Sequence, residues 1–365
     1  MNAVFSEKAI DAASRPRSEL LLELIGVTKV FENFVAVAPT DLRVMAGEFF
    51  TIVGPSGSGK TTLLRMLAGM EVPSGGDILL RGERLNDMPA NRRPTCLVFQ
   101  SLALFPHKSV GQNIEFALKM KGIDAATRKA RALDLMRMVR LPESYYGKNV
   151  MKCSGGERQR VALARAFAYD PEILLFDEPL SAIDYKLRKT LEKELKDLHR
   201  ETGKTFLYIT HSLEEAMVMS DRIGVMRAGS VVQVGTPEEI YSRPSNRFVA
   251  EFMGEVNTID VNPIGPGLFQ GVDLPGIFKA PPGAPQVPGT LVIRPEFLRL
   301  IATAGETDNH VTGTVYNEYS LGSRMQYQVR TQTKTLLVEQ PRRRLPAQGM
   351  ALVGWNAADA IFVTD

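Results

Sequence analysis

The amino-acid sequence contains no uninterrupted apolar run that approaches the roughly 18–20 residues of a membrane-spanning helix. It has two cysteines, Cys96 and Cys153, which excludes a disulfide-rich secreted scaffold and favours a reducing compartment. Residues 1–19 are polar and of mixed charge, without the apolar centre of a signal peptide, and we expect them to form a loose N-terminal tail. The protein is therefore not expected to span a membrane, although it could dock onto one.

An excess of charge of one sign is also lacking. The chain of 365 residues carries 44 Lys and Arg against 41 Asp and Glu, a formal net charge of +3. This balance excludes a basic surface that binds nucleic acid over a large area, and no nucleic-acid partner is expected. With 44% hydrophobic and 23% charged residues, the composition is that of a globular protein long enough for about two or three domains.

Short apolar runs alternate with helical patterns over the first two thirds of the chain. This alternation predicts an α/β domain with a largely parallel sheet, and continuously apolar runs are typical of strands covered on both faces. Strands are expected at residues 20–27, 48–53, 77–80, 95–99, 173–176 and 205–209, helices at 61–68 and 185–200, and a hairpin at 225–234.

The segment 103–168 interrupts the alternation and predicts a helical insertion within the α/β domain. Its helical patterns lie at residues 113–121, 125–139 and 157–168.

The composition changes after about Gly254. Residues 261–289 hold many prolines and glycines and have no helical period, and evenly spaced short β-like runs follow, as is typical of a small barrel. We therefore expect a tail at 1–19, an α/β domain at 20–240, a connecting segment at 241–289 and a β domain at 290–365.

Residues 54–61 match the phosphate-loop pattern G-x-x-x-x-G-K-[ST], between an apolar strand and a helix-forming run. Glycines at these spacings let backbone N–H groups converge on a polyphosphate, and the following helix N-terminus adds positive potential. Lys60 can reach the β- and γ-phosphates, and the Thr61 hydroxyl can ligate Mg²⁺. The predicted nucleotide-binding residues here are Gly54, Pro55, Ser56, Gly57, Ser58, Gly59, Lys60, Thr61 and Thr62.

The apolar run at 173–176 is followed by two carboxylates, Asp177 and Glu178. The carboxyl end of a strand in an α/β sheet faces the ligand crevice. Asp177 is predicted to hold Mg²⁺, directly or through water, and Glu178 to orient or deprotonate an attacking water. Together with the phosphate loop, this pattern predicts hydrolysis of a nucleotide.

A second anion site is predicted at Ser154-Gly155-Gly156, where backbone donors and a hydroxyl open a basic helical run. One chain would then carry two separate phosphate-binding helix starts. This is explained if the second contacts a nucleotide bound to a partner subunit.

These motifs occur in the order of one family, and over residues 20–240 the chain resembles the nucleotide-binding subunit of an ATP-binding cassette (ABC) transporter. Residues 255–365 more loosely resemble the TOBE-like regulatory β domain of ABC importer ATPases, through Arg294-Pro295-Glu296 and Gly354-Trp355. The resemblance implies an α/β P-loop NTPase fold with antiparallel β and helical subdomains, followed by a small all-β, OB-like barrel. The matching elements are the phosphate loop at 54–61, Gln100 of the Q-loop, the signature at 153–157, the Walker B strand at 173–178, the D-loop at 181–184 and His211 of the switch loop.

The resemblance also implies roles for single residues, with ATP and Mg²⁺ as cofactors. Gln100 would sense Mg²⁺ and the attacking water, and His211 would touch the γ-phosphate. Phe31 lies where the family places an aromatic residue that stacks on adenine. A buried position in a core strand is the alternative for Phe31, and Phe34 is the rival candidate for adenine.

The signature departs from the family pattern, because Cys153 replaces Leu and Glu157 replaces Gln. In the D-loop, Ile183 replaces Leu. A carboxylate near a polyanion is unfavourable, so Glu157 either weakens the contact with the nucleotide or points elsewhere. The signature residues expected to bind nucleotide are Ser154, Gly155, Gly156 and Glu157.

The partners implied by the resemblance are a second copy of the chain and the subunits of a transmembrane permease. Two copies of the chain would sandwich two ATP molecules. The chain would be a peripheral subunit at the cytoplasmic face of the membrane. The permease would receive cargo from a periplasmic or extracellular binding protein. An exposed apolar groove at Leu104, Phe105 and Pro106 is a candidate docking surface. Internal packing of the helical insertion is the alternative for these side chains.

The segment 248–257 resembles ATPases of polyamine-type importers, which favours spermidine or putrescine as cargo. Similar segments in importers of sulfate, iron, glycerol-phosphate or sugar leave those cargoes open. A soluble ABC ATPase of DNA repair or translation is the alternative, but it would be expected to have a coiled-coil insertion or two fused cassettes, and this sequence has one phosphate loop and no heptad stretch. A module that merely senses ATP would not need Lys60, Asp177, Glu178 and His211 together.

Overall fold

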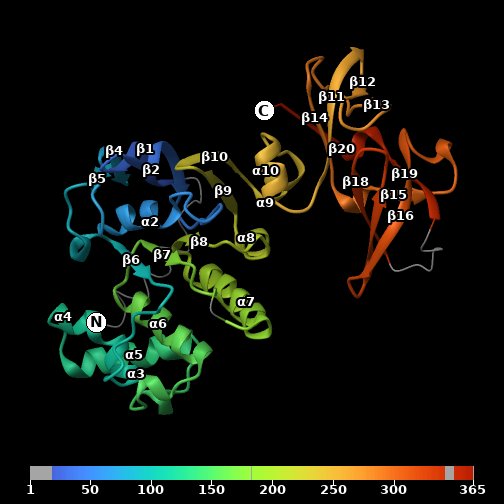
Figure 1. Cartoon of the computed structure of the whole chain (residues 1–365). Coiled ribbons are helices and arrows are strands. Elements are labelled where there is room, and N and C mark those ends of the chain that lie inside the picture. Colours follow the sequence, from blue (N-terminus) through green and yellow to red (C-terminus); the bar gives the residue numbers. More distant parts are fainter. Residues whose placement is uncertain (1–18, 182, 342–348, 365) are drawn as a thin grey trace. The chain divides into compact units, whose positions relative to one another are not determined.

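The computed structural model describes residues 19–181, 183–341 and 349–364 (Figure 1). The chain divides into two compact units, Met1–Pro237 and Glu238–Asp365. The expected N-terminal tail, apart from Glu19, and Ala182 of the expected D-loop lie outside the described residues.

A six-stranded sheet forms the centre of the first unit, in the order β10-β9-β3-β8-β7-β6. The four strands β3, β6, β7 and β8 and their neighbour β9 pair in parallel, and β10 closes the expected hairpin with β9. All five residues of β3 and of β8 are buried, as expected for strands covered on both faces. The bounds are β3 Phe49–Val53, β6 Thr95–Val98, β7 Ile173–Asp177, β8 Thr205–Ile209, β9 Arg222–Arg227 and β10 Ser230–Gly235.

A second, antiparallel sheet has the order β2-β1-β4-β5 and covers one face of the central sheet together with helix α2. Apolar side chains between these layers, including Leu24, Ile52, Leu64 and Leu175, form one buried core. The strand β2 was not among the strands expected from the sequence. The bounds are β1 Leu20–Phe31, β2 Phe34–Met45, β4 Gly75–Leu80, β5 Glu83–Arg84 and α2 Lys60–Ala68.

The helical insertion packs on the other face of the central sheet (Figure 1). Ile114, Met136 and Leu163 from its helices meet Phe176 and Phe206 from the sheet in a second core. The helix expected at 113–121 is instead two short helices that begin earlier, at Val110. The bounds are α3 Val110–Ile114, α4 Phe116–Met120, α5 Ala125–Met138 and α6 Gly155–Ala168.

Two further helices follow the strands that carry the expected catalytic residues. Helix α7, Tyr185–Thr202, starts after the N-cap Asp184 and is followed by the C-cap Gly203, whose φ of 61° is left-handed. Helix α8, Leu213–Met219, starts after the N-cap Ser212. In the described part of the chain, no helix has both the length and the apolar character needed to cross a membrane.

The second unit is largely β structure, which confirms the expected all-β region. Its strands form two five-stranded sheets, in the orders β13-β12-β11-β14-β20 and β15-β19-β16-β17-β18. Trp355, Phe269 and Phe278 are buried in a core between them. The bounds are α9 Pro237–Ser242, α10 Arg247–Phe252, β11 Asn257–Gly265, β12 Leu268–Gly271, β13 Ile277–Lys279, β14 Gly289–Ile293, β15 Arg299–Ile301, β16 Asn309–Ser320, β17 Arg324–Arg330, β18 Thr335–Pro341, β19 Gly349–Trp355 and β20 Ala360–Val363.

Candidate active site

The glycine-rich loop lies between β3 and α2, and its glycines are needed for close approach of backbone to backbone. Gly57 and Gly59 have φ values of 78° and 98°, a left-handed backbone conformation that residues with a side chain rarely adopt. A Cβ atom at Gly54 would lie 2.2 Å from the carbonyl oxygen of Met226, and one at Gly59 would lie 2.3 Å from that of Ala36. The loop is therefore a narrow backbone cradle that other residues could not form.

The ammonium of Lys60 folds back over this cradle. Its Nζ donates hydrogen bonds to the carbonyl oxygens of Gly54, at 2.8 Å, and Pro55, at 2.9 Å. Burial lowers the pKa of Lys60, while the charges of Glu178 and Asp177 act in the opposite direction. Because the described acceptors of this ammonium are neutral oxygens, an anionic ligand can bind to it without displacing a carboxylate partner.

Asp177, the last residue of β7, meets the first turn of α2. Its Oδ1 accepts a hydrogen bond from the Thr61 hydroxyl at 3.1 Å. Burial raises the pKa of Asp177, with the charge of Glu178 adding to the rise and the Thr61 hydrogen bond opposing it. A hydroxyl and a carboxylate side by side are hard oxygen donors that fit Mg²⁺, which takes its remaining ligands from water and phosphate.

Metal sites built wholly from His, Cys, Asp and Glu side chains do not occur in the described ranges, where no group of three or more such residues could hold an ion.

Glu178 follows at the carboxyl end of β7 in a strained conformation. Its φ of 44° is left-handed, which is rare for a residue other than glycine, and its N–H donates to the Ile209 carbonyl at 3.0 Å. His211, two residues beyond β8, has Nδ1 at 3.1 Å from Glu178 Oε2. The pairing of Asp177 with Ile209 in neighbouring strands brings the carboxylate and the imidazole together.

Gln100 reaches the same corner through Ser181. Gln100 Nε2 donates to Ser181 Oγ at 2.9 Å, and Ser181 Oγ donates to the carbonyl of Glu178 at 3.0 Å. No single-residue role was predicted for Ser181. Its position three residues after Glu178, within the segment that resembles the D-loop, was the available signal.

The Ser154 motif opens helix α6 as a capping box. Ser154 Oγ accepts from the Glu157 N–H at 3.3 Å, and Glu157 Oε2 accepts from the Ser154 N–H at 2.8 Å. Lys148 Nζ lies 3.2 Å from the same carboxylate, and the Tyr145 hydroxyl lies 3.3 Å from its other oxygen. These hydrogen bonds and the Lys148 charge lower the pKa of Glu157, with the Ser154 N–H contributing most. The Glu157 carboxylate thus binds the N-terminal end of its own helix, α6, at the Ser154 N–H.

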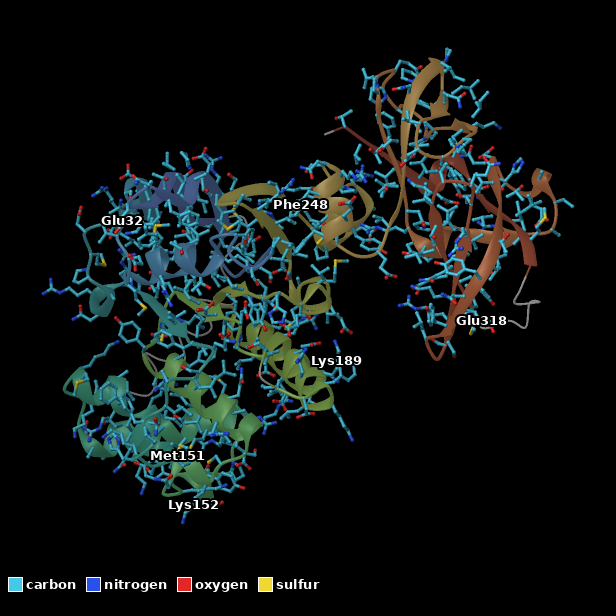
Figure 2. All side chains as sticks on the ribbon, in the orientation of Figure 1. Glu32, Met151, Lys152, Lys189, Phe248 and Glu318 are labelled. Carbon is cyan, nitrogen blue, oxygen red and sulfur yellow. The ribbon has the colours of Figure 1, made fainter. Side chains whose placement is uncertain are left out.

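No hydrogen bond or ion pair between described residues joins this capped turn to the phosphate loop or to Asp177 and Glu178. Its neighbours on the chain, Met151 and Lys152, are exposed (Figure 2). The structure therefore brings five of the expected motifs to one corner and leaves the signature outside it.

Two family models match the chain: one described as ABC transporter over residues 37–181, and one described as TOBE domain over residues 291–363. A protein of Mesorhizobium japonicum named spermidine/putrescine import ATP-binding protein PotA is 44% identical over 306 residues, which cover 81% of this chain and 84% of that protein. The chain belongs to the ABC transporter family.

Two further comparisons agree with this assignment. A Bacillus cereus protein with the same name is 52% identical to this ABC protein over 239 residues, covering 66% of this chain and 73% of the relative. The structure of a dimeric, post-hydrolysis state of the ATP-binding cassette MJ0796, bound to ADP and Pi, superposes with a TM-score of 0.53 at 32% identity, over 60% of this chain and 99% of the other. The resemblance and the fold class expected from the sequence are confirmed.

The two aromatic candidates for adenine lie at the tip of the β1–β2 hairpin of this ABC protein. Phe31 and Phe34 pair with each other across the turn and are 40% and 63% exposed, so the alternative of a buried core position for Phe31 was wrong. Glu32 lies between them in the turn (Figure 2). Lys29 Nζ lies 4.7 Å from the centroid of the Phe31 ring, so one face of this ring carries a cation.

The candidate docking groove at Leu104, Phe105 and Pro106 does not expose the two apolar side chains that a docking surface would need. Leu104 and Phe105 are half-buried, and Leu104 packs against the core of the helical insertion. The Phe105 ring lies 4.6 Å from that of Phe116, between ring centroids. Internal packing accounts for both side chains, while Pro106 is exposed.

Proposed function

We propose that this ABC protein is the ATP-hydrolysing subunit of an importer and that a dimer of it, closed on ATP, drives a membrane permease. One observation carries the proposal. The hydrogen bonds Thr61–Asp177, Glu178–His211 and Gln100–Ser181 join segments from five parts of the sequence at the carboxyl ends of β3, β7 and β8. This is the side of an α/β sheet where ligands bind.

Each residue of the corner has a task that its chemistry fits. The loop N–H groups and Lys60 bind the phosphates of ATP, and an exposed aromatic ring at Phe31 stacks on the base. Thr61 and Asp177 would hold Mg²⁺, with Gln100 close to it, and the ion would neutralise charge on the phosphate oxygens. Glu178 orients or deprotonates the attacking water, and His211 holds Glu178 in place and faces the γ-phosphate.

The capped turn at Ser154–Glu157 is left for a nucleotide held by a second copy of the chain. ATP then favours the closed dimer, since both halves of each site are complete only in that state. A shift from 1:99 to 99:1 requires about 5.5 kcal/mol of differential binding. The dimeric state of the similar cassette supports this arrangement.

A polyamine, spermidine or putrescine, is the proposed cargo. Two relatives that are 44% and 52% identical are named for import of these compounds. The further proposed partners are permease subunits and, through them, a substrate-binding protein, with this chain peripheral at the cytoplasmic face of the membrane. We further propose the α/β ATPase at 20–240 and a regulatory β domain at 290–365, joined by 241–289.

The test compares Glu178→Gln with Lys60→Ala in the full chain, with and without its permease. Glu178→Gln should bind ATP normally, slow hydrolysis by about 100-fold or more and accumulate dimers, because the base is lost but the phosphate contacts remain. Lys60→Ala should weaken ATP binding by roughly 10-fold or more. Near-normal turnover by Glu178→Gln would contradict the role of the base. Uptake of labelled putrescine, with sulfate and a sugar as comparisons, tests the cargo.

A further inference from the structure

A carboxylate outside the proposed catalytic set is buried directly behind the switch loop. Glu215, in the first turn of α8, is 2% exposed. Its Oε2 accepts hydrogen bonds from the Thr210 hydroxyl at 2.7 Å and the Tyr208 hydroxyl at 2.9 Å. A carboxylate is unfavourable to bury unless such donors satisfy it, so its retention here needs an explanation.

The Thr210 hydroxyl links this carboxylate to both sides of His211. It donates to Glu215 and accepts from the Ser212 N–H at 2.9 Å. The Ser212 hydroxyl in turn accepts from the Glu215 N–H at 3.3 Å. The backbone immediately before and after His211 is thus tied to the start of α8.

The side chain of His211 itself has little packing to hold it. It is 59% exposed, and the contact described for it is the one with Glu178 at 3.1 Å. The direction of its ring therefore depends on the backbone that carries it.

We propose that Thr210, whose hydroxyl is anchored by Glu215, is a positioning residue that sets His211 against Glu178. The inference rests on the proposed function and adds to it a residue that never touches the nucleotide. A small misplacement of a catalytic group lowers turnover more than it lowers ground-state binding.

The chain offers a matched control in Tyr208. Its hydroxyl binds the same oxygen of the same carboxylate, but from within the buried strand β8 and without a hydrogen bond to the switch loop in the described structure. Removal of either hydroxyl takes one donor from Glu215, and only the Thr210 change also releases the Ser212 N–H.

The experiment measures kcat and KM for ATP in the full chain for Thr210→Val, Thr210→Ser and Tyr208→Phe. Thr210→Val should lower kcat by about 10- to 100-fold with KM nearly unchanged. Thr210→Ser, which keeps the hydroxyl, should restore most of the activity, and Tyr208→Phe should stay close to wild type. Thr210→Ala provides a second removal of the hydroxyl if the valine variant does not fold. The proposal is overturned if Tyr208→Phe loses as much kcat as Thr210→Val, or if the hydroxyl-free variants keep kcat.

A His211→Ala background separates this inference from the proposed function. Thr210→Val should cause no further loss there, because both changes remove the same interaction. An additive loss would overturn the positioning role. If His211→Ala alone left hydrolysis unchanged, the proposed role of His211 would fail, whereas a slow His211→Ala with an active Thr210→Val would refute the positioning inference alone.

Discussion

Burial shifts the pKa values of the two charged residues beside the phosphate loop in opposite directions. The pKa of Lys60 is lowered and that of Asp177 is raised, and burial is the largest cause in both cases. Both shifts mean that the folded protein disfavours the charged form. A site that holds buried charge in the absence of its ligand is therefore less stable than one without it.

We therefore predict that Asp177→Asn raises the melting temperature of the nucleotide-free protein at neutral pH. The folded-state pKa of Asp177 lies above the unfolded-state value, so folding becomes less favourable as the pH rises through that interval, and the full loss is present above it. Asn removes the charge and keeps an oxygen for Thr61. Calorimetry from pH 4 to pH 8 should show the gain at the upper end of the range only.

The same variant should lose Mg²⁺-dependent hydrolysis. Asp87→Asn is the matched control, because its side chain is 86% exposed and its change should leave both the melting temperature and hydrolysis nearly unaltered. A lower melting temperature for Asp177→Asn at neutral pH would show that its hydrogen bond to Thr61 outweighs the burial of charge.

At the scale of elements, the sequence predicts best where a single local signal is strong. The run at 205–209, in which four apolar residues follow Thr205, predicts β8, and all five residues are buried. Helix α7 begins at Tyr185, as expected from its leucine stripe, and ends one residue before Gly203. In both cases the pattern of burial and the end signals agree.

The strand β2 was missed because Pro39 interrupts its pattern. Proline cannot donate a ladder hydrogen bond and argues against a strand interior. In the structure, the register between β1 and β2 shifts between the pairs Val27–Thr40 and Lys29–Val37, next to this proline. The irregularity accommodates Pro39, and a tertiary feature of this kind has no local sequence signal.

The strands β11, β12 and β13 were missed for a related reason. Residues 261–289 are rich in proline and glycine and have no helical period, yet β11 pairs with β12 on one side and with β14 on the other. Pro263 lies within β11, opposite Phe269, which is buried in the core. Pairing between these consecutive strands, and not an alternating pattern within each run, decides this structure.

The candidate site shows the same division between local and distant signals. Motif spacing selects Lys60, Asp177 and Glu178, and the resemblance to the family adds His211. The hydrogen bonds of Ser181 and Glu215 depend on which loops meet at the carboxyl ends of β7 and β8, and neither residue has a role that its local sequence predicts. Tertiary contacts between short polar side chains leave no periodic pattern to detect.

The start of helix α6 gives a prediction at the element scale. Lys148 compensates the charge of Glu157, which stands where the family has Gln. Lys148→Met keeps an unbranched side chain of similar length, but removes the ammonium that lies 3.7 Å from the centroid of the Tyr145 ring and leaves the carboxylate uncompensated beside the turn proposed to face ATP. We expect apparent ATP affinity in the dimer to fall roughly 5-fold, since a partly exposed ion pair contributes about 1 kcal/mol.

A charge-neutral signature should reverse this effect. Glu157→Gln retains the capping oxygen, so the double variant Lys148→Met with Glu157→Gln should recover wild-type ATP affinity. Lys148→Arg keeps the positive charge and should have wild-type ATP affinity. The ATP dependence of dimerisation in a slow Glu178→Gln background measures the affinity of these three variants and of the unchanged signature. Equal losses in the single Lys148→Met variant and in the double variant would show that Lys148 acts through its contact with Tyr145 and not by compensating the charge of Glu157.

At the scale of the whole molecule, the chain consists of two compact units, each with cores of its own. The cores of the first unit surround the central sheet, and that of the second lies between two five-stranded sheets around Trp355. Every residue that we assign to ATP or Mg²⁺ belongs to the first unit. A ligand that binds there stabilises the unit that folds to form the site.

We therefore predict two thermal transitions for the full chain, of which ATP moves one. In the Glu178→Gln variant with Mg²⁺, ATP at about 100 times its Kd should contribute about 2.7 kcal/mol and raise the transition of the first unit by about 5–10 °C. Calorimetry resolves the two events, and fluorescence of Trp355, the single tryptophan, reports the second unit. Lys60→Ala serves as the control and should show little shift at the same ATP concentration. If ATP raises the tryptophan transition by the same amount as the other, the two units unfold together and the nucleotide site is energetically coupled to the β unit.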